Sequence, residues 1–262
     1  MKSPQETVVS IMAEAVDCIG MPRFPEVLLR CLQAVVPFEF SVVFGYHDSH
    51  RPLDLFDNFP SRKRKVMVDD YQEGPYLLDP LFRAAQAPAK VGLVRLRDIA
   101  PDRFYQGEYF RNYYIQTGLA EEIGFIVDVG EKVTVVISAM RETKPFSARE
   151  FRDLEALYPF VRALTQRHWG NLISRFSHMP AQSDQHLPQL IDKAFKDFGR
   201  NNLTAREAEI VEYILKGFSS EATGRALGIS TGTVRIHRRN IYAKLGVSSQ
   251  GELFSAFITS MG

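Results

Sequence analysis

The sequence predicts an α+β N-terminal sandwich, in which helices flank an antiparallel sheet, followed by an all-helical C-terminal domain. Three observations predict this arrangement. Stretches rich in β-branched and aromatic residues, typical of strands, occur in the N-terminal part. Downstream of Pro188 there is no further proline, and the apolar residues recur with the period of a helix. Between the two parts lies a polar seam with two early prolines.

The N-terminal elements follow from these patterns in order. Helices are expected at residues 5–18, 24–35, 61–72 and 102–116. Strands are expected at residues 38–47, 121–129 and 133–141. A three-residue connection containing Gly130 joins the last two strands, which predicts a hairpin. Ser147 then opens a long helix toward Trp169, with a kink at Pro159.

The polar seam sets the predicted domain boundaries. It contains one short stretch in which apolar residues recur at helical spacing, so we interpret it as a linker with a helix. The three predicted segments are residues 1–175, the linker 176–202, and residues 203–262.

Composition limits the classes of function. With 262 residues, 45% of them hydrophobic and 24% charged, the chain is long enough for two globular domains. The net charge of +1 gives no overall attraction to nucleic acid or membranes, so a charged partner has to be inferred from local charge. No apolar run approaches a membrane span, and the N-terminus lacks a signal-peptide pattern. We therefore expect a cytoplasmic protein without a membrane partner.

The stretch STGTVRIHRRNIYAKLGV, residues 230–247, predicts a helix with two different faces. On a wheel of 100° per residue, three apolar side chains fall within about 40° of one another and form the packing stripe: Val234, Ile241 and Leu245. The opposite face carries two long bases, one aliphatic residue and two small residues: Gly232, Arg235, Ile236, Arg239 and Ala243. Ser230 is a natural N-cap and Gly246 a natural C′ residue.

The elements before this helix complete a helix-turn-helix. Thr204 and Glu207 form a capping box that opens one helix, and a second, short helix runs from about Ser219 to Leu227. Between residues 222 and 251 there are five basic residues and no acidic one, although the whole chain is nearly neutral. Such local asymmetry is typical of a surface that binds double-stranded DNA.

Residues 203–254 resemble the LuxR-type helix-turn-helix domain. The family pattern is L-T-x-R-E, then G-x-S, then L-x-I-S-x-x-T-V, then H, then K-L-G-V, and it is matched in order and spacing. The departures lie in the second helix, where Ala222, Thr223 and Gly224 replace the usual Glu, Ile and Ala and are expected to loosen that helix. The resemblance implies a four-helix domain. Its third helix enters the major groove, and its fourth, around residues 252–258, pairs two protomers into a homodimer.

The resemblance also implies specific DNA contacts on the face that the helical wheel selects. The base-contacting positions of the family correspond to Arg235, Ile236 and Arg239. Arginine bonds bidentately to guanine, and isoleucine meets a thymine methyl group. Side chains on the flanks suit phosphate oxygens, and these are Thr233, His237, Lys244 and Ser219. For His237 the alternative is a packing role beside the apolar stripe.

The N-terminal part resembles the autoinducer-binding domain found upstream of this helix-turn-helix in quorum-sensing regulators, a fold akin to PAS and GAF domains. The resemblance rests on Tyr71, Tyr76 and the pair Asp79-Pro80. It implies that the aspartate accepts a hydrogen bond from a ligand amide. Three positions depart from the pattern, namely Met67, Val94 and Glu122, which stand near or at two tryptophans and a glycine of the family. These departures argue against a standard acyl-homoserine lactone.

Two interpretations of the N-terminal site stay open. The candidate ligand contacts are Asp79, Tyr71, Tyr76 and Glu122, and two carboxylates in a poorly solvated site would favour a cationic or multi-donor ligand. Alternatively, Asp79 simply caps a turn or helix.

No catalytic pattern is present. The sequence has no G-x-S-x-G elbow, no H-E-x-x-H, no phosphate-binding glycine loop and no Cys/His cluster with metal spacing. The two cysteines, Cys18 and Cys31, lie in amphipathic stretches and are expected to be buried thiols. We therefore predict no enzyme, cofactor or metal. A ligand-sensing dimeric regulator and a ligand-independent regulator, whose N-terminal domain serves only dimerisation or protein interaction, remain the alternatives.

Overall fold

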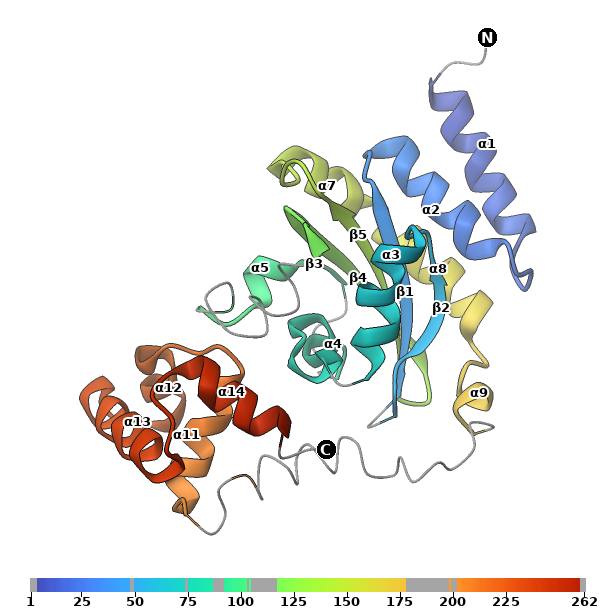
Figure 1. The fold of residues 1–262 in the computed structure, drawn as a ribbon. Coiled ribbons are helices and arrows are strands. Elements are labelled where there is room, and N and C mark those ends of the chain that lie inside the picture. Colours follow the sequence, from blue (N-terminus) through green and yellow to red (C-terminus); the bar gives the residue numbers. More distant parts are fainter. Residues whose placement is uncertain are drawn as a thin grey trace. The chain divides into compact units, whose positions relative to one another are not determined.

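The computed structural model describes residues 4–47, 50–73, 75–86, 92–102, 104, 117–177, 198 and 202–259. Two compact units are present (Figure 1). Unit 1 comprises Met1–Ile99 and Gly118–Gln182, and unit 2 comprises Ala100–Thr117 and Ser183–Gly262. The segment Ala100–Thr117 thus belongs to the same compact unit as the helix-turn-helix. The predicted linker helix lies outside the described residues, as does nearly all of the helix expected at 102–116.

Unit 1 is built on one antiparallel sheet of five strands in the order β2-β1-β5-β4-β3. The strands are β1 (Phe40–His47), β2 (Leu53–Asp57), β3 (Gly92–Arg95), β4 (Glu121–Gly130) and β5 (Val133–Arg141). The three predicted strands and the α+β class are confirmed. The sheet also contains β2 and β3, which the sequence did not predict. β2 and β3 are only five and four residues long, and β2 has a uniform intermediate burial rather than an alternating one. Strands of four or five residues are too short to give a clear period-2 pattern in the sequence.

The β4–β5 hairpin confirms the prediction and shows how the chain reverses. Glu131 and Lys132 both have positive φ, 51° and 60°. Two consecutive residues with positive φ give a turn whose twist matches that of the strands it joins. The Asp128 carboxylate accepts a hydrogen bond from Gly130 N at 2.8 Å, which fixes the start of the turn.

One face of the sheet packs against α1 (Pro4–Asp17), α2 (Phe24–Val35), α7 (Ala148–Ala156), α8 (Tyr158–Trp169) and α9 (Ile173–Ser177) (Figure 1). The core between them is apolar and buried, and it includes both cysteines, which are free thiols. Ser147 begins α7, as predicted, and forms a capping box with Glu150. The expected kink at Pro159 is instead a break, because α7 ends at Ala156 and α8 begins at Tyr158 with the proline in its first turn.

The other face of the sheet is covered by short helical pieces: α3 (Ser61–Arg64), the π-helix η1 (Lys65–Asp70), the 3-10 helix η2 (Pro75–Leu78) and α4 (Pro80–Ala85). A further short helix, α5 (Leu96–Ile99), follows β3. Gly124 permits the close approach of α4, because a Cβ atom there would lie 2.7 Å from the Leu81 side chain. This face carries the residues of the predicted ligand site.

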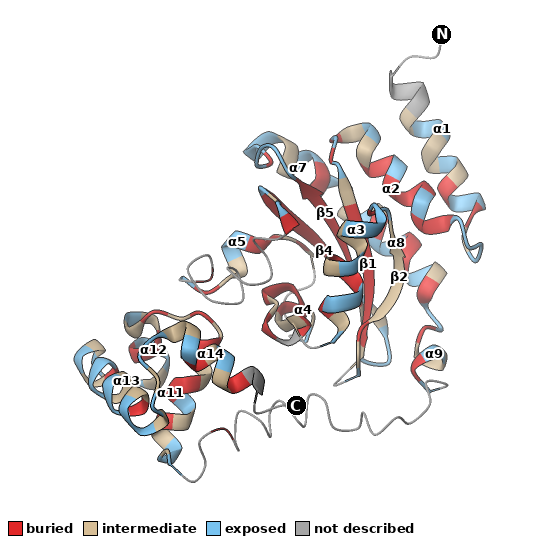
Figure 2. Cartoon of the chain, in the orientation of Figure 1, coloured by how far each residue is buried: buried red, intermediate tan, exposed pale blue. Residues whose placement is uncertain are grey.

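Unit 2 contains the four helices implied by the resemblance: α11 (Ala205–Leu215), α12 (Ser220–Leu227), α13 (Thr231–Leu245) and α14 (Gln250–Thr259). Each of these helices has buried positions, which are red in Figure 2. They form a small core that includes Ile210, Ile214, Val234, Ile241 and Leu253. Among the described residues, no helix is both long and apolar enough to cross a membrane.

Candidate nucleic-acid interface and ligand site

Helix α13 has the two faces that its sequence predicts. Val234 and Ile241 are fully buried, whereas Arg235, Ile236 and Arg239 are exposed (Figure 2). Leu245, the third member of the predicted stripe, is only partly buried. Ile236 is 52% exposed and lies on the same face of α13 as the two arginines. The exposure of this face is confirmed, and its contact with bases stays a prediction.

The ends of α13 are fixed by the caps expected from the sequence. Ser230 Oγ accepts a hydrogen bond from Thr233 N at 3.0 Å, and the two hydroxyls lie 2.8 Å apart. Gly246 has φ 67°, and its N–H donates to the Tyr242 carbonyl. Thr233 therefore stands in the first turn of α13, where backbone N–H groups favour anions.

Helix α12 is held against the turn that precedes α13. The Arg206 guanidinium donates to the Leu227 carbonyl at 2.7 Å, an anchor that sequence reasoning missed. A Cβ atom on Gly224 would lie 2.7 Å from the Ile229 carbonyl, so the glycine allows the tight crossing of helix and turn. The helix is unbroken to Leu227, and the expected loosening by the departures at 222–224 stays a prediction.

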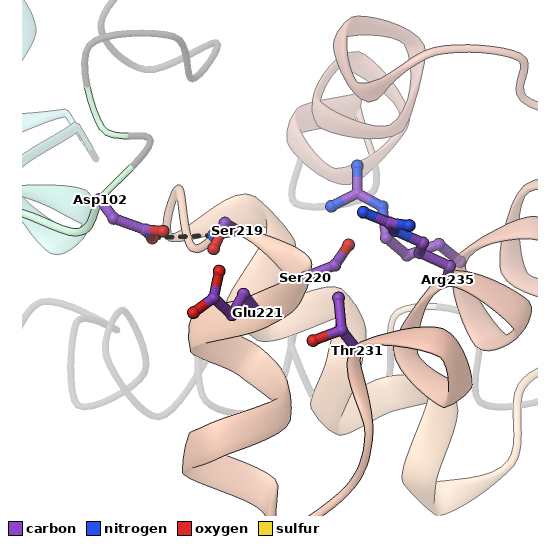
Figure 3. A pocket seen from close by; sticks show the side chains of 7 residues that line it. Asp102, Ser219, Ser220, Glu221, Thr231 and Arg235 are labelled. Carbon is purple, nitrogen blue, oxygen red and sulfur yellow. Dashed lines mark hydrogen bonds between the residues drawn. The ribbon is translucent and has the colours of Figure 1, made fainter.

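Ser219 proves to be the N-cap of α12 rather than part of its first turn. Its Oγ accepts a hydrogen bond from Ala222 N at 3.1 Å, and its own N–H donates to the Asp102 carboxylate at 2.9 Å (Figure 3). A pocket of about 450 Å³ opens beside it. Its lining residues are polar or charged: Asp102, Ser219, Ser220, Glu221, Thr231, Arg235 and Arg238.

His237 and Lys244, two predicted phosphate ligands, have different surroundings. His237 is partly buried, and its Nδ1 atom is buried without a hydrogen-bond partner among the described residues. The Lys244 ammonium donates to Glu207 Oε2 at 2.7 Å. Glu207 also accepts from Thr204 N at 2.8 Å and is only 3% exposed. Lys244 thus has a structural partner that the sequence did not reveal, and its contact with DNA stays a prediction.

The Lys244–Glu207 pair gives the C-terminal unit a dependence on pH. The hydrogen bond from Lys244, assisted by Thr204, lowers the pKa of Glu207 to about 2, against partial desolvation. A carboxyl group with a depressed pKa stabilises the folded state above its unfolded pKa of about 4.3, and this contribution is lost as the pH falls toward the folded value.

We expect Lys244→Gln to lower the free energy of unfolding of the C-terminal unit by about 1 kcal/mol at pH 7, because Lys244 is partly exposed and solvent screens the pair. The loss of stability between pH 5 and pH 3 should also become smaller. Hydrogen exchange of the α13 amides at pH 7 and thermal unfolding by circular dichroism across this range measure both effects. Arg225→Gln is the matched control, because both members of its pair with Glu221 are 68% exposed. Equal effects of the two variants would contradict the assignment.

In unit 1, Tyr71 and Asp79 form a hydrogen-bonded cluster on the sheet face that α4 covers. The Tyr71 hydroxyl donates to Asp79 Oδ2 at 2.7 Å, and the Tyr46 and Tyr71 hydroxyls lie 2.9 Å apart. The Phe44 and Tyr71 rings stack at 5.0 Å. Tyr76 is fully buried, and its ring meets the edge of Phe82 at 5.1 Å.

Asp79 also has the capping role that the sequence left open. Its Oδ1 atom accepts a hydrogen bond from Leu81 N at 2.8 Å and thereby caps α4. Desolvation of the carboxyl group raises the pKa of Asp79 to about 6, although the bonds from Tyr71 and Leu81 act in the opposite direction. A carboxyl group with this pKa changes its charge near neutrality.

Glu122 reaches the same face of the sheet through the strand register. It lies two residues before Gly124, against which α4 packs, so both positions face α4. Glu122 is 7% exposed. The structure therefore places Asp79, Tyr71, Tyr76 and Glu122 on one side of the sheet. Within the described residues, no three His, Cys, Asp or Glu side chains are arranged to hold a metal ion.

The neighbouring Glu121 points the other way and forms an ion pair that sequence reasoning missed. Arg95 Nη1 donates to Glu121 Oε1 at 2.7 Å and to the Phe146 carbonyl at 2.9 Å. The two side chains are 6% and 4% exposed. The guanidinium also lies 4.4 Å from the centre of the Phe151 ring.

Comparison with known proteins supports both halves of this description. Residues 201–257 match the family model described as bacterial regulatory proteins, luxR family. The chain is 32% identical over 186 residues to an Aeromonas salmonicida protein described as "Putative HTH-type transcriptional regulator in exeN 3′ region", which covers 70% of this chain and 94% of that protein. It is 24% identical over 237 residues to the monoamine regulon transcriptional regulator of Klebsiella aerogenes, covering 89% of this chain and 91% of that one.

The N-terminal fold has a counterpart among solved structures. The LBD domain of VqsR from Pseudomonas aeruginosa superposes with a TM-score of 0.53 at 24% identity, covering 61% of this chain and 94% of that one. At this identity the similarity establishes the fold of the N-terminal part.

Proposed function

Because this chain belongs to the LuxR family of bacterial regulatory proteins, we propose that it binds an inverted-repeat operator as a dimer and that a small molecule controls this binding. As a family member it is a DNA-binding transcription regulator and not an enzyme. One observation carries the proposal of operator binding: the exposed face of α13 presents Arg235, Ile236 and Arg239 side by side, while its other face is buried in the domain.

The residues of this face suit the edges of base pairs. Arg235 and Arg239 each have a planar group that bonds to guanine O6 and N7, and Ile236 suits a thymine methyl group. Gly232, near the start of the same helix, is exposed and has no side chain to hold the backbone away from the groove. Phosphate contacts by Thr233, His237, Lys244 and Ser219 would fix the helix in register.

Dimer symmetry sets the form of the operator. Two copies of α13 related by a twofold axis would enter successive major grooves about 34 Å apart and read an inverted repeat. We infer the dimer from the family and from this symmetry argument, with α14 as the candidate pairing helix.

Selection from a random duplex library tests this part of the proposal. The purified full-length chain should enrich an inverted repeat whose half-sites are centred about one helical turn apart. The affinity should fall steeply with added salt, because phosphate contacts release counterions. Enrichment of a single half-site would contradict the proposed dimer. Binding that does not depend on salt and enriches no sequence would contradict the proposed operator binding.

The ligand site is proposed at Asp79, Tyr71, Tyr76 and Glu122. Two buried or partly buried carboxyl groups lie on one sheet face together with several aromatic rings. Carboxylates in a poorly solvated site are stabilised by a cation or by several donors, and aromatic faces also attract cations. A cationic amine fits this chemistry better than a neutral acyl lactone. The Klebsiella aerogenes relative is named for a monoamine regulon, which agrees with this choice.

Two measurements test whether the chain binds an amine. They are native mass spectrometry of protein purified from its own cells and a thermal-shift screen of amines. We expect a bound or stabilising amine whose effect disappears in Asp79→Asn, because asparagine keeps the oxygen that caps α4 but loses the charge. Asp17→Asn, an exposed carboxyl group on α1, is the matched control. Stabilisation by the amine that is equal in both variants would contradict the assignment of Asp79.

A specific observation favours the second candidate, a ligand-independent regulator. Both oxygens of Asp79 already have donors, Tyr71 and Leu81, so the carboxylate does not need a ligand to be satisfied. A dimer that binds DNA, carries no copurified molecule and is stabilised by no compound in the screen would establish this alternative.

A further inference from the structure

Asp102 brings a carboxylate from the connection between β3 and β4 to the helix-turn-helix. The two partners in this contact, Asp102 and Ser219, are 117 residues apart in the sequence and belong to the same compact unit. Asp102 lies in a closed turn, because Phe104 N donates to the Pro101 carbonyl at 2.8 Å. Pro101 and Phe104 are both buried, so the position of Asp102 is supported on both sides.

The Asp102 carboxylate lines a pocket that also holds basic and hydroxyl-bearing side chains. It lines the same pocket as Arg235 and Arg238 of α13 and the hydroxyl-bearing Ser220 and Thr231 (Figure 3). Ser219 N–H, at the start of α12, adds the positive end of a helix. Glu221, the other acid at this pocket, is paired with Arg225 through a salt bridge.

We propose that Asp102 occupies the place of a DNA backbone phosphate and holds the DNA-binding surface in an inhibited state. A backbone N–H donates one strong hydrogen bond, so Ser219 cannot serve Asp102 and a phosphate at the same time. A carboxylate that lines the same pocket as Arg235 also repels the phosphates of an approaching duplex. The hydrogen bond between Ser219 and Asp102 therefore has to break before the duplex is bound.

This inference rests on the proposed DNA binding and adds a means of control. The connection that carries Asp102 begins after Arg95 at the end of β3 and ends before Glu121 at the start of β4. Glu122, a proposed ligand residue, is the second residue of β4. A ligand bound at Glu122 would control this contact only through its differential affinity for the masked and unmasked states.

Fluorescence anisotropy of full-length protein with a labelled duplex tests the proposal. Asp102→Asn removes the charge but keeps an oxygen for Ser219, and Asp102→Ala removes both. We expect Asp102→Ala to bind the duplex about three- to tenfold more tightly than the parent, because a competing hydrogen bond of ordinary net strength is lost. Asp102→Asn, which loses only the charge, should bind more tightly than the parent but less tightly than the alanine variant. Asp98→Asn is the matched control, because Asp98 is an exposed acid in the same connection and its carboxylate lies 3.7 Å from the Arg97 guanidinium.

Unchanged or weaker binding by both Asp102 variants, with folding verified by thermal unfolding, would overturn the inhibitory contact while leaving DNA binding intact. Failure of the parent chain and every variant to bind any duplex would instead remove the proposed function, and the inference with it. A second readout is the exchange rate of the Ser219 amide hydrogen. It should rise in Asp102→Ala and stay unchanged in Asp98→Asn, and equal rates in the parent and the alanine variant would also overturn the contact.

Discussion

Replacing Glu121 with leucine is expected to lower the free energy of unfolding of the N-terminal unit by about 3–5 kcal/mol. The loss of stability arises because the charge of Arg95 would remain buried without its partner. Arg95 is 6% exposed, and without Glu121 its positive charge would be buried with only the carbonyls of Phe146 and Ser147 as acceptors. Urea denaturation followed by the fluorescence of Trp169, the only tryptophan in the chain, reports on this unit.

A second substitution distinguishes the buried charge from a simple packing defect. Combining Arg95→Met with Glu121→Leu removes both charges, and replacing a buried pair by apolar residues of similar size is often neutral. We expect the double variant to regain most of the lost stability. Asp153→Asn is the control, because its partner Arg149 is 87% exposed and such pairs contribute little. A double variant no more stable than Glu121→Leu would show that the ion pair is not the cause.

Replacing Arg235 or Arg239 with alanine should weaken binding to the selected operator by about 1–3 kcal/mol each, or roughly 5- to 150-fold. Each variant should also relax the base preference at one position of each half-site, because a bidentate contact to guanine is lost. The stability of the domain should not change, since both side chains are exposed. Anisotropy with the operator and with single-base variants of it measures both effects.

Arg225→Ala supplies the control within the same domain. It removes the same charge from α12, where the side chain is exposed and paired with Glu221. We expect a smaller loss that is similar for all duplexes, as for a charge that attracts the backbone without reading bases. A uniform loss in the Arg235 and Arg239 variants would place α13 outside the major groove.

Local patterns predicted the DNA-binding helices well. The buried and exposed faces of α13 follow from its 3.6-residue period, and the caps at Ser230 and Thr204 follow from side chains that bond to N–H groups three residues away. Both features depend on residues three or four positions apart, so they can be predicted from the local sequence.

Partners far apart in the sequence could not be predicted. Asp102 with Ser219, Lys244 with Glu207 and Arg95 with Glu121 are joined by tertiary packing alone. The candidate ligand site could be predicted only in part. The Asp-Pro pair indicated both a cap and a ligand contact, and the structure confirms the cap, but only the sheet register brings Glu122 to the same face.

The exposed side chain of Ile236 has a thermodynamic consequence for how the free protein meets DNA. An isoleucine with 52% of its surface in water carries a hydration shell that folding has not removed. Covering it in a groove releases that water, so tight association would be accompanied by a drop in heat capacity. A loose encounter through phosphates alone leaves the shell in place. The change in heat capacity on association therefore distinguishes nonspecific binding along the duplex from specific binding at the operator.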